Sequence, residues 1–281
     1  MTGSADVTVV IPTHRRNEYL VDAIASVVAQ ELSPAALVVS DDVGDLSTRS
    51  LVEDWAARAP FPVRYLDSSG PGAGTAGASR NAGAELATTG ILAFLDDDDS
   101  WQPAFLRATT EALSTASADF AVAWTSADAE GYHIQRIGPG LSATQVVARN
   151  PGFVGSNFVM RTAAFRALGG FDPDLPVSND KDFLVRALQA SLHYAVVERV
   201  LVLNRIHGAG QLTDKSHRRA EGIQRYMTKH AVLLSDWDRR YLRAQLASVL
   251  RVAAPSLVAR WRYTGELAAL RLGLAMRGGE R

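Results

Sequence analysis

Four consecutive aspartates, Asp96 to Asp99, follow an apolar run in the segment LAFLDDDDSW, residues 92–101. Neighbouring carboxylates raise one another's pKa unless a cation neutralises them. Magnesium and manganese prefer oxygen ligands, and they often combine one or two carboxylates with the phosphate oxygens of a substrate. A D-x-D pair at a strand end, here Asp96 and Asp98, therefore predicts a metal that bridges a diphosphate.

An alternative reading of the aspartates and the lack of cysteine limit what can be concluded about a metal site. The aspartates could instead form a solvated acidic turn in which Asp99 or Ser100 caps the next helix, and the sequence leaves this alternative open. The chain of 281 residues contains no cysteine, so thiolate metal sites, disulfides and cysteine nucleophiles are excluded. Any metal must bind oxygen or imidazole.

Strand and helix patterns alternate four times before the aspartates. A continuous apolar run such as VTVVI predicts a strand buried on both faces of a parallel sheet. The alternation predicts a doubly wound sheet whose ligands bind beyond the carboxyl ends of the strands, where Asp42 and the four aspartates fall. The predicted strands cover residues 7–11, 36–40, 62–67 and 91–95, and the predicted helices cover 18–30, 46–58 and 76–87.

The alternation loosens after residue 100. Residues 101–116 have a helical pattern, and residues 120–127 and 131–137 have strand patterns. Residues 152–171 combine a short strand with a helix. We expect mixed strands here, forming the second wall of a cleft.

Three of these segments together resemble a known family. VTVVIPTHRRNEYLVDAIASVVAQ, VVSDD and SRNAGAELATTGILAFLDDDDSWQPAFL are similar to the nucleotide-binding half of the inverting family 2 glycosyltransferases. The resemblance covers roughly residues 7–210 and is strongest in the first 110. It implies an α/β protein of the GT-A type, with a doubly wound, mostly parallel, Rossmann-like sheet, a mixed acceptor-side half and C-terminal helices.

The resemblance also implies roles on the donor side. The loop after the first strand would line the nucleotide base, Asp42 would bond the base edge, and Arg80 would reach the nucleotide or pair with nearby carboxylates. Asp96 would lie near the ribose and Asp98 would bind the metal. Because four aspartates stand in a row, the D-x-D motif could be shifted by one residue, and Asp97 and Asp99 are then the alternatives. The implied donor-binding residues are Pro12, Thr13, His14, Asp42, Arg80, Asp96 and Asp97.

On the acceptor side, NDKDFLVR at residues 179–186 resembles the family's E-D-x-D-L-x-x-R element. Asp180 falls where the family has its catalytic base, which takes the acceptor's proton while the metal stabilises the departing diphosphate. Asn179 departs from the pattern, because glutamate is usual there. Asp182 is expected to be a charge partner of the helix N-terminus.

His207, in the loop NRIHGAGQLTD, matches a family histidine that could complete the metal site together with Asp96 and Asp98. The expected cofactor is Mn²⁺ or Mg²⁺, and the expected donor is a UDP-, dTDP- or GDP-linked sugar. The acceptor would supply a hydroxyl from a glycan, a lipid-linked sugar or a natural product. No nucleic-acid partner is expected.

Charge divides the chain unevenly. From Asp214 to the end there are 14 Lys/Arg and 6 Asp/Glu, which leaves 15 and 24 for residues 1–213. The basic tail has helical spacing and suggests either helices packed on the main domain or a peripheral membrane surface. We expect a nucleotide-sugar half at 1–110, an acceptor half at 111–213 and a basic helical extension at 214–281. The N-terminus lacks a signal-peptide pattern, so a cytoplasmic location is expected.

The sequence therefore predicts a metal-dependent, inverting glycosyltransferase of the hexosyltransferase type. Two other classes compete with it. A haloacid-dehalogenase-like phosphatase or phosphotransferase also uses a D-x-D pair after a strand. In that class the pair follows the first strand, whereas here three predicted strands come before the strand that ends in the aspartates. A sugar-nucleotide-binding module without catalysis would fit the missing charge at Asn179. The glycine run at residues 70–77 lacks the lysine of a phosphate loop and predicts a flexible donor loop.

Overall fold

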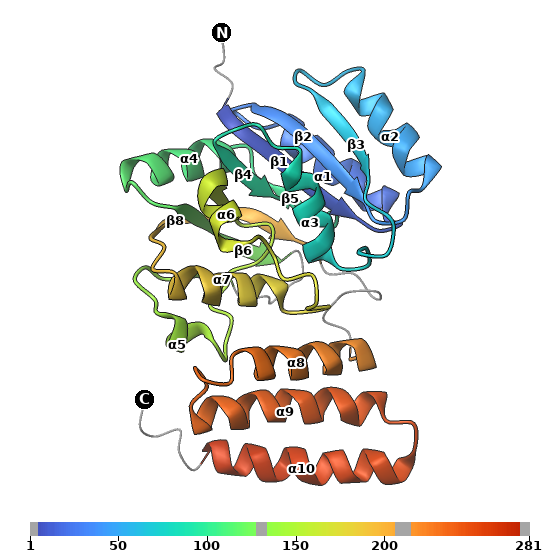
Figure 1. Ribbon diagram of the computed structural model, residues 1–281, viewed down its shortest axis with the longest axis vertical. Coiled ribbons are helices and arrows are strands. Elements are labelled where there is room, and N and C mark those ends of the chain that lie inside the picture. The colour runs from blue at the N-terminus through green and yellow to red at the C-terminus, as the bar shows by residue number, and fades with distance from the viewer. Residues whose placement is uncertain (1–4, 128–133, 206–214, 276–281) are drawn as a thin grey trace.

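An eight-stranded sheet forms the centre of the computed structural model, which describes residues 5–127, 134–205 and 215–275 (Figure 1). The strand order is β3-β2-β1-β4-β7-β6-β8-β5. The first four strands along the chain run parallel, β7 is antiparallel to both β4 and β6, β8 is parallel to β6, and β5 is antiparallel to β8. The strands are β1 (Ala5–Thr13), β2 (Pro34–Asp41), β3 (Val63–Asp67), β4 (Ile91–Phe94), β5 (Asp99–Trp101), β6 (Phe120–Ala127), β7 (Phe158–Arg161) and β8 (Tyr194–Asn204).

Helices cover both faces of this sheet. Side chains of α1, α2 and α4 join one buried cluster, and side chains of α3, α6 and α7 join the other. The two faces are the doubly wound arrangement that the sequence predicted. The helices are α1 (Asn17–Val28), α2 (Leu46–Ala56), α3 (Ala76–Glu85), α4 (Phe105–Thr115), α5 (Ala143–Val146), α6 (Thr162–Leu168), α7 (Asn179–Gln189), α8 (His217–Lys229), α9 (Asp236–Ala253) and α10 (Leu257–Ala275).

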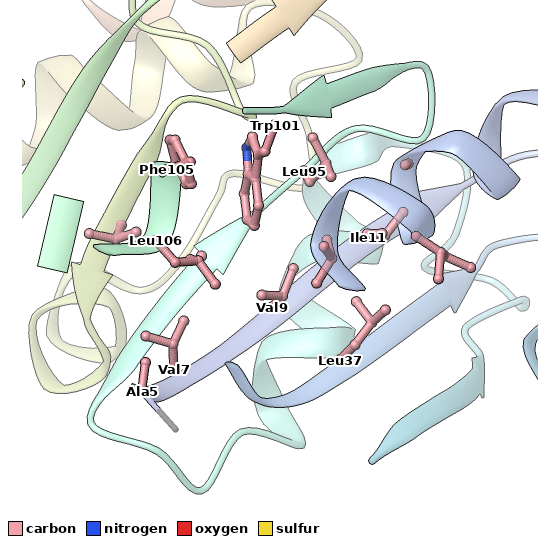
Figure 2. Close-up of a cluster of buried hydrophobic side chains, with 14 of the residues drawn as sticks. Ala5, Val7, Val9, Ile11, Leu37, Leu95, Trp101, Phe105 and Leu106 are labelled. Atoms are coloured by element: carbon pink, nitrogen blue, oxygen red, sulfur yellow. The ribbon is translucent and has the colours of Figure 1, made fainter. Parts of the chain in front are cut away.

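Alternation along β1 assigns its side chains to the two cores. Val7, Val9 and Ile11 lie in the first cluster with Trp101 and Phe105 (Figure 2), whereas Val10 lies in the second. Successive side chains of a strand point to opposite faces, so a strand that is buried on both sides reads as one apolar run. The same core fixes the carboxyl ends of β1 and β4, where the polar residues begin.

The second core is built largely from phenylalanine. Phe171 and Phe183 stack with ring centroids 4.6 Å apart, and Phe158 lies 5.5 Å from Phe183. Phe94 of β4 meets Phe171 edge to face at 5.3 Å. Offset and edge-to-face aromatic pairs stabilise a core beyond their buried area. The cluster therefore fixes α7, whose first turn carries Asp180, to the end of β4, which carries the aspartates.

The structure differs from the expected elements in two places. Asp99–Trp101 forms the short strand β5 against β8, and α4 begins at Phe105, whereas the helical pattern was expected to begin at Trp101. The part of residues 131–137 that is described makes only an isolated bridge, between Gln135 and Thr125, rather than the expected strand. For β5, pairing with a distant strand decides the outcome, which local periodicity does not encode.

The three C-terminal helices stack in layers beyond α7, with α10 farthest from the sheet (Figure 1). Leu267, Leu270 and Leu274 of α10 pack on Ala244 and Ala247 of α9. Along the described part of the chain, no helix has the length and apolar character needed to cross a membrane.

Candidate active site

The four aspartates alternate between partly exposed and buried positions. The side chains of Asp96 and Asp98 are 30% and 16% exposed, whereas that of Asp97 is only 6% exposed and Asp99 is also buried. Asp97 and Asp98 lie in a turn after β4, and the Asp99 backbone N–H closes this turn by donating to the Asp96 carbonyl oxygen at 3.1 Å. Asp96 and Asp98 are therefore the two carboxylates that a ligand can reach, and they form the D-x-D pair.

Asp97 is held inside the protein. Its Oδ2 accepts hydrogen bonds from Thr13 Oγ1 at 2.8 Å and from the His14 backbone N–H at 3.3 Å. Burial and the neighbouring Asp98 raise the pKa of Asp97 to about 6, although Arg16 and Thr13 act in the opposite direction. Asp97 thus joins the ends of β1 and β4.

Asp99 is the second buried carboxylate. Its Oδ2 accepts from Ser156 Oγ at 2.5 Å and from Asn204 Nδ2 at 2.8 Å. Burial and the charges of Asp96 and Asp98 raise the pKa of Asp99 well above its ordinary value. Because Ser156 precedes β7 and Asn204 ends β8, Asp99 links the two halves of the sheet.

Two arginines supply positive charge to this cluster. Arg16 Nη1 lies 2.8 Å from Asp98 and 3.3 Å from Asp97. Arg80 is buried and pairs with Asp96 through Nη2. The protein therefore compensates part of the crowded negative charge with its own side chains.

Arg80 occupies space that a glycine leaves open. A Cβ atom at Gly155 would overlap the Arg80 guanidinium, and the ring of Phe171 lies 5.0 Å from Arg80 Cζ. Arg80 Nη1 donates to Asn179 Oδ1 at 3.1 Å. Arg80 thus connects Asp96, on the donor side, with the first residue of α7.

Asn179, where the family pattern has glutamate, is buried. Its Nδ2 and the Nε of Arg80 find no hydrogen-bond partner within the described residues. A carboxylate at this position would add a second anion beside Asp180. The asparagine instead accepts a bond from Arg80 without adding charge.

Asp180 lies in the first turn of α7. The preceding Ser178 has a left-handed backbone with φ of 63°, an unusual conformation for a residue with a side chain, and it turns the chain sharply into the helix. Asp180 Oδ1 accepts from the Lys181 backbone N–H at 2.7 Å. Burial raises the pKa of Asp180, and the charge of nearby Asp96 acts in the same direction, while Arg80 opposes both. The structure thus places the expected base within electrostatic reach of the aspartates.

The remaining donor-side residues lie at the ends of β1 and β2. Nδ1 of His14 lies 2.6 Å from Oδ1 of Asp42, and the His14 side chain is 63% exposed. Pro12 and Thr13 are buried, and Thr13 faces Asp97. Asp41 is buried and accepts from the Asp45 backbone N–H and from Tyr65, so its contacts are structural.

Asp182 has a larger role than a helix-dipole partner. It is fully buried and binds Arg186 at 2.8 Å, Lys229 at 2.7 Å and His230 at 2.7 Å. Burial by itself would raise the pKa of Asp182, but the bonds from His230, Lys229 and Arg186 outweigh it and lower the pKa to about 2. Asp182 therefore fastens α7 to the end of α8.

Asp96 and Asp98 fit the donor set of a magnesium or manganese ion. Such ions commonly take one or two protein carboxylates and complete their shell with phosphate oxygens and water. Within the described residues there is no group of three or more carboxylates and histidines that would hold an ion alone. His207, the third expected ligand, lies outside the described residues.

Sequence comparison matches residues 8–169, more than half of the chain, to the family described as glycosyl transferase family 2. An uncharacterized glycosyltransferase, alr2836, of Nostoc sp. is 33% identical over 109 residues, which cover 39% of this chain and 33% of the relative. The succinoglycan biosynthesis protein ExoO of Rhizobium meliloti is 37% identical over 117 residues, covering 42% and 32%. The chain thus matches about a third of the length of these curated relatives.

Solved structures agree on the fold. TarS residues 1–349 of S. aureus, in complex with UDP-GlcNAc, has a TM-score of 0.60 at 16% identity, covering 94% of this chain and 71% of that one. The mannosyltransferase PcManGT of Pyrobaculum calidifontis, in complex with GDP-Man and Mn²⁺, has a TM-score of 0.61 at 16% identity, covering 99% and 85%. No observation favours the phosphatase alternative. The chain belongs to glycosyl transferase family 2 and has the GT-A fold.

Proposed function

We propose that this protein is an inverting glycosyltransferase that moves a sugar from a nucleoside-diphosphate sugar to an acceptor hydroxyl. The observation that carries the proposal is the bridge from Asp96 through Arg80 to Asn179, because it brings an expected donor site beside Asp180. A carboxylate next to a diphosphate-binding edge is what direct displacement at an anomeric carbon needs. Membership of the family supports the same reaction.

In the proposed reaction Asp180 takes the proton of the acceptor hydroxyl. The acceptor oxygen forms a bond to the anomeric carbon as the bond to the diphosphate oxygen breaks, and the diphosphate leaves with the bonding electrons. A single displacement inverts the configuration at that carbon. The raised pKa of Asp180 makes its carboxylate a stronger base than an exposed aspartate.

Asp96 and Asp98 would hold the metal, and Arg16 and Arg80 lie beside them. A bound Mn²⁺ or Mg²⁺ supplies positive charge to the diphosphate. The two arginines add fixed charge at the same edge of the sheet and can neutralise the leaving group further. His207 stays a predicted third ligand.

The donor class is proposed from two lines of support. The site has carboxylates and arginines at the ends of parallel strands, where nucleotides bind in such sheets. The related structures were solved with UDP-GlcNAc and with GDP-Man, so UDP-, dTDP- and GDP-sugars are the donors to test. His14 and Asp42 are the proposed contacts to the base. Pro12, Thr13 and Asp97 are buried behind this loop, and Asp97 holds it through bonds from Thr13 and the His14 backbone.

Two substitutions test the proposal. In Asp180→Asn, donor and Mn²⁺ should still bind while sugar transfer is lost, because the base has gone and the donor edge is intact. In Asp98→Ala, the Mn²⁺-dependent part of donor binding should be lost. Calorimetric titration of a nucleoside diphosphate, with and without Mn²⁺, measures binding, and release of nucleoside diphosphate from the sugar donor in the presence of acceptor measures turnover.

Glu31→Gln is the matched control, because Glu31 forms an exposed ion pair with Arg107 of α4. It should change neither property. Transfer by both Asp180→Asn and Asp98→Ala would refute the assignment. Donor binding without turnover in the unchanged protein, over a broad set of acceptors, would favour the non-catalytic module instead.

The division into residues 1–110, 111–213 and 214–281 and the cytoplasmic location stay predictions from the sequence, as does the absence of a nucleic-acid partner. The identity of the acceptor is open among a glycan, a lipid-linked sugar and a natural product. We also propose a peripheral membrane contact through the basic C-terminal helices, and the surface of α10 supports it as follows.

A further inference from the structure

The outward face of α10 is apolar along its whole length. At about 100° per residue, the residues of this face fall within an arc of about 120°. This arc contains no charged residue, and Trp261 and Val258 are 74% and 81% exposed. Its larger members are Leu257, Val258, Trp261, Ala268, Ala269 and Leu272. We refer to this arc as the α10 face.

The opposite side of α10 is already occupied. Leu267 is buried against α9, with Leu270 and Leu274 beside it. The α10 face is therefore not needed for packing within the described chain. Monomeric proteins rarely expose a continuous apolar surface of this kind unless it binds something.

Arginines flank the α10 face on both sides. By helical geometry Arg260 and Arg271 lie along one border and Arg262 along the other, with Glu266 as the only acidic residue of α10. On the border with Arg271, a cavity of about 260 Å³ is lined also by Lys215 and Arg219, next to α8. Positive charge is thus concentrated on the border with Arg260 and Arg271, because Glu266 lies close to Arg262 on the other border.

This combination fits the surface of an anionic bilayer. An amphipathic helix lies in the interface with its apolar side in the acyl boundary and its cations toward lipid phosphates. Arginine can keep its guanidinium at the headgroups while its methylenes remain in apolar surroundings, and tryptophan favours the same depth. Each cation near an anionic surface contributes about 1 kcal/mol.

A second copy of the chain fits this face less well. Pairing two α10 faces would bring the arginine borders of both helices together, with one Glu266 from each copy to offset them. Like charges placed opposite each other oppose such an interface. The charge of the borders therefore favours lipid phosphate over self-association.

We propose that the α10 face docks the protein on anionic lipid membranes, with α10 lying in the plane of the interface. This docking is independent of the proposed sugar transfer, because α8 and α9 separate α10 from the sheet (Figure 1). The partner is a bilayer that carries anionic headgroups, and its apolar boundary takes Trp261 and Leu272.

Vesicle co-sedimentation tests the docking. Vesicles of equal parts phosphatidylcholine and phosphatidylglycerol should bind the full chain, and vesicles of phosphatidylcholine alone should bind it at least about tenfold more weakly. The double variant Trp261→Ser/Leu272→Ser should lose at least about tenfold in affinity for the mixed vesicles. The variant Arg260→Gln/Arg271→Gln should lose affinity and also salt sensitivity.

Val232→Ser is the matched control, because Val232 is 92% exposed but lies in the turn after α8 rather than on α10. It should bind like the unchanged protein. Donor binding in solution should be the same in all variants, which separates failure of the docking from failure of the proposed enzyme activity, and circular dichroism verifies folding. Equal binding to both vesicle types, unchanged binding of Trp261→Ser/Leu272→Ser, or a dimer that this variant dissociates would overturn the proposal.

Discussion

Asn179 is the residue that most distinguishes this site from the family pattern. It binds Arg80 as an uncharged acceptor, so Arg80 keeps its positive charge available to Asp96 and Asp180. A glutamate there would bring an extra negative charge close to the base. The structure therefore links a single substitution in a motif to the acidity of the neighbouring residue.

This link predicts a pH effect. The pKa of Asp180 is raised above 3.8, and only its deprotonated form can act as a base, so transfer should fall as pH drops through this raised value. Asn179→Asp should move the acid limb of kcat/KM to higher pH, because a second anion favours the protonated form of Asp180. Asn179→Gln, which adds no charge, should leave the limb in place. A limb that stays fixed in Asn179→Asp would mean that another group controls the pH profile.

Individual residues of the site were predictable to different degrees. The aspartates, Arg80 and Asp180 were predicted from motifs, because their order along the chain carries the signal. Four identical residues in a row conceal which carboxylates face outward, and only the backbone after β4 resolves this. Arg16 was visible next to Arg15 but carried no sign of its contact with Asp98. The space left by Gly155 for Arg80 depends on a contact between distant segments and has no local pattern.

At the scale of elements, α8 holds α7 in place through Asp182. Lys229, at the end of α8, also lies 2.5 Å from Asp172, and Gly222 lets α8 approach Val177, where a Cβ atom would overlap the valine. These contacts lie on both sides of the turn that carries Ser178 and Asp180. The basic C-terminal segment thus supports the acceptor half as well as carrying the α10 face.

Removing the Asp182 carboxylate, which joins α7 to α8, should destabilise the protein. In Asp182→Asn the buried His230 and the more exposed Arg186 and Lys229 lose the buried carboxylate that they share, and the free energy of unfolding should fall by about 3–5 kcal/mol. The exposed i,i+4 pair of Glu221 and Arg225 provides the control, since Glu221→Gln should cost at most about 1 kcal/mol. Urea unfolding followed by circular dichroism measures both.

The contribution of Asp182 to stability should decrease as the pH falls. The pKa of Asp182 is lowered to about 2, so its contribution to stability, about 2 kcal/mol, is complete above the ordinary value of 3.8 and is lost as pH falls toward 2. The stability difference between Asp182→Asn and the unchanged protein should therefore shrink in that range. A difference that stays constant with pH would assign the effect to packing.

Close packing of α3 on β1 predicts that a glycine-to-alanine substitution has different effects on stability in different helices. A Cβ atom at Gly83 would overlap Val10, so Gly83→Ala should destabilise the protein by about 1–3 kcal/mol. Gly265 in α10 has open space around it, and Gly265→Ala should stabilise the helix by up to about 1 kcal/mol. Opposite signs for the same substitution, measured by thermal unfolding, would verify that the contact with Val10 matters. Equal effects would show that helix propensity dominates at both positions.

The predicted elements before residue 100 agree with the structure to within a few residues at their ends, because long apolar runs and helical spacing carry a strong local signal. β5 was missed since it has three residues, one of which is the buried Asp99. Its existence depends on pairing with β8, more than 100 positions away in the chain. The elements that join the two halves of the sheet are therefore the least visible in the sequence.

For the whole molecule, charge compensation predicts that the fold does not need a metal. The aspartates already have partners in Arg16, Arg80, Thr13 and Ser156. Exchange of Mn²⁺ for a chelator, without nucleotide, should shift the midpoint of thermal unfolding by less than about 2 °C. Mn²⁺ together with a nucleoside diphosphate should raise it further, since both bind only the folded state. A large shift from Mn²⁺ alone would indicate that the ion is part of the folded core.

The stack of α8, α9 and α10 also determines how far the candidate active site lies from a membrane on which α10 is docked. Packed helices lie about 8–10 Å apart, so two spacings place the axis of α8 about 16–20 Å from that of α10. On a docked enzyme, Asp180 lies above even that level, since α7 is attached to the far side of α8. A hydroxyl at headgroup depth would be out of reach. A membrane-bound acceptor would therefore have to project from the bilayer, and the depth of the C-terminal helices would set the minimum length at which it can be elongated.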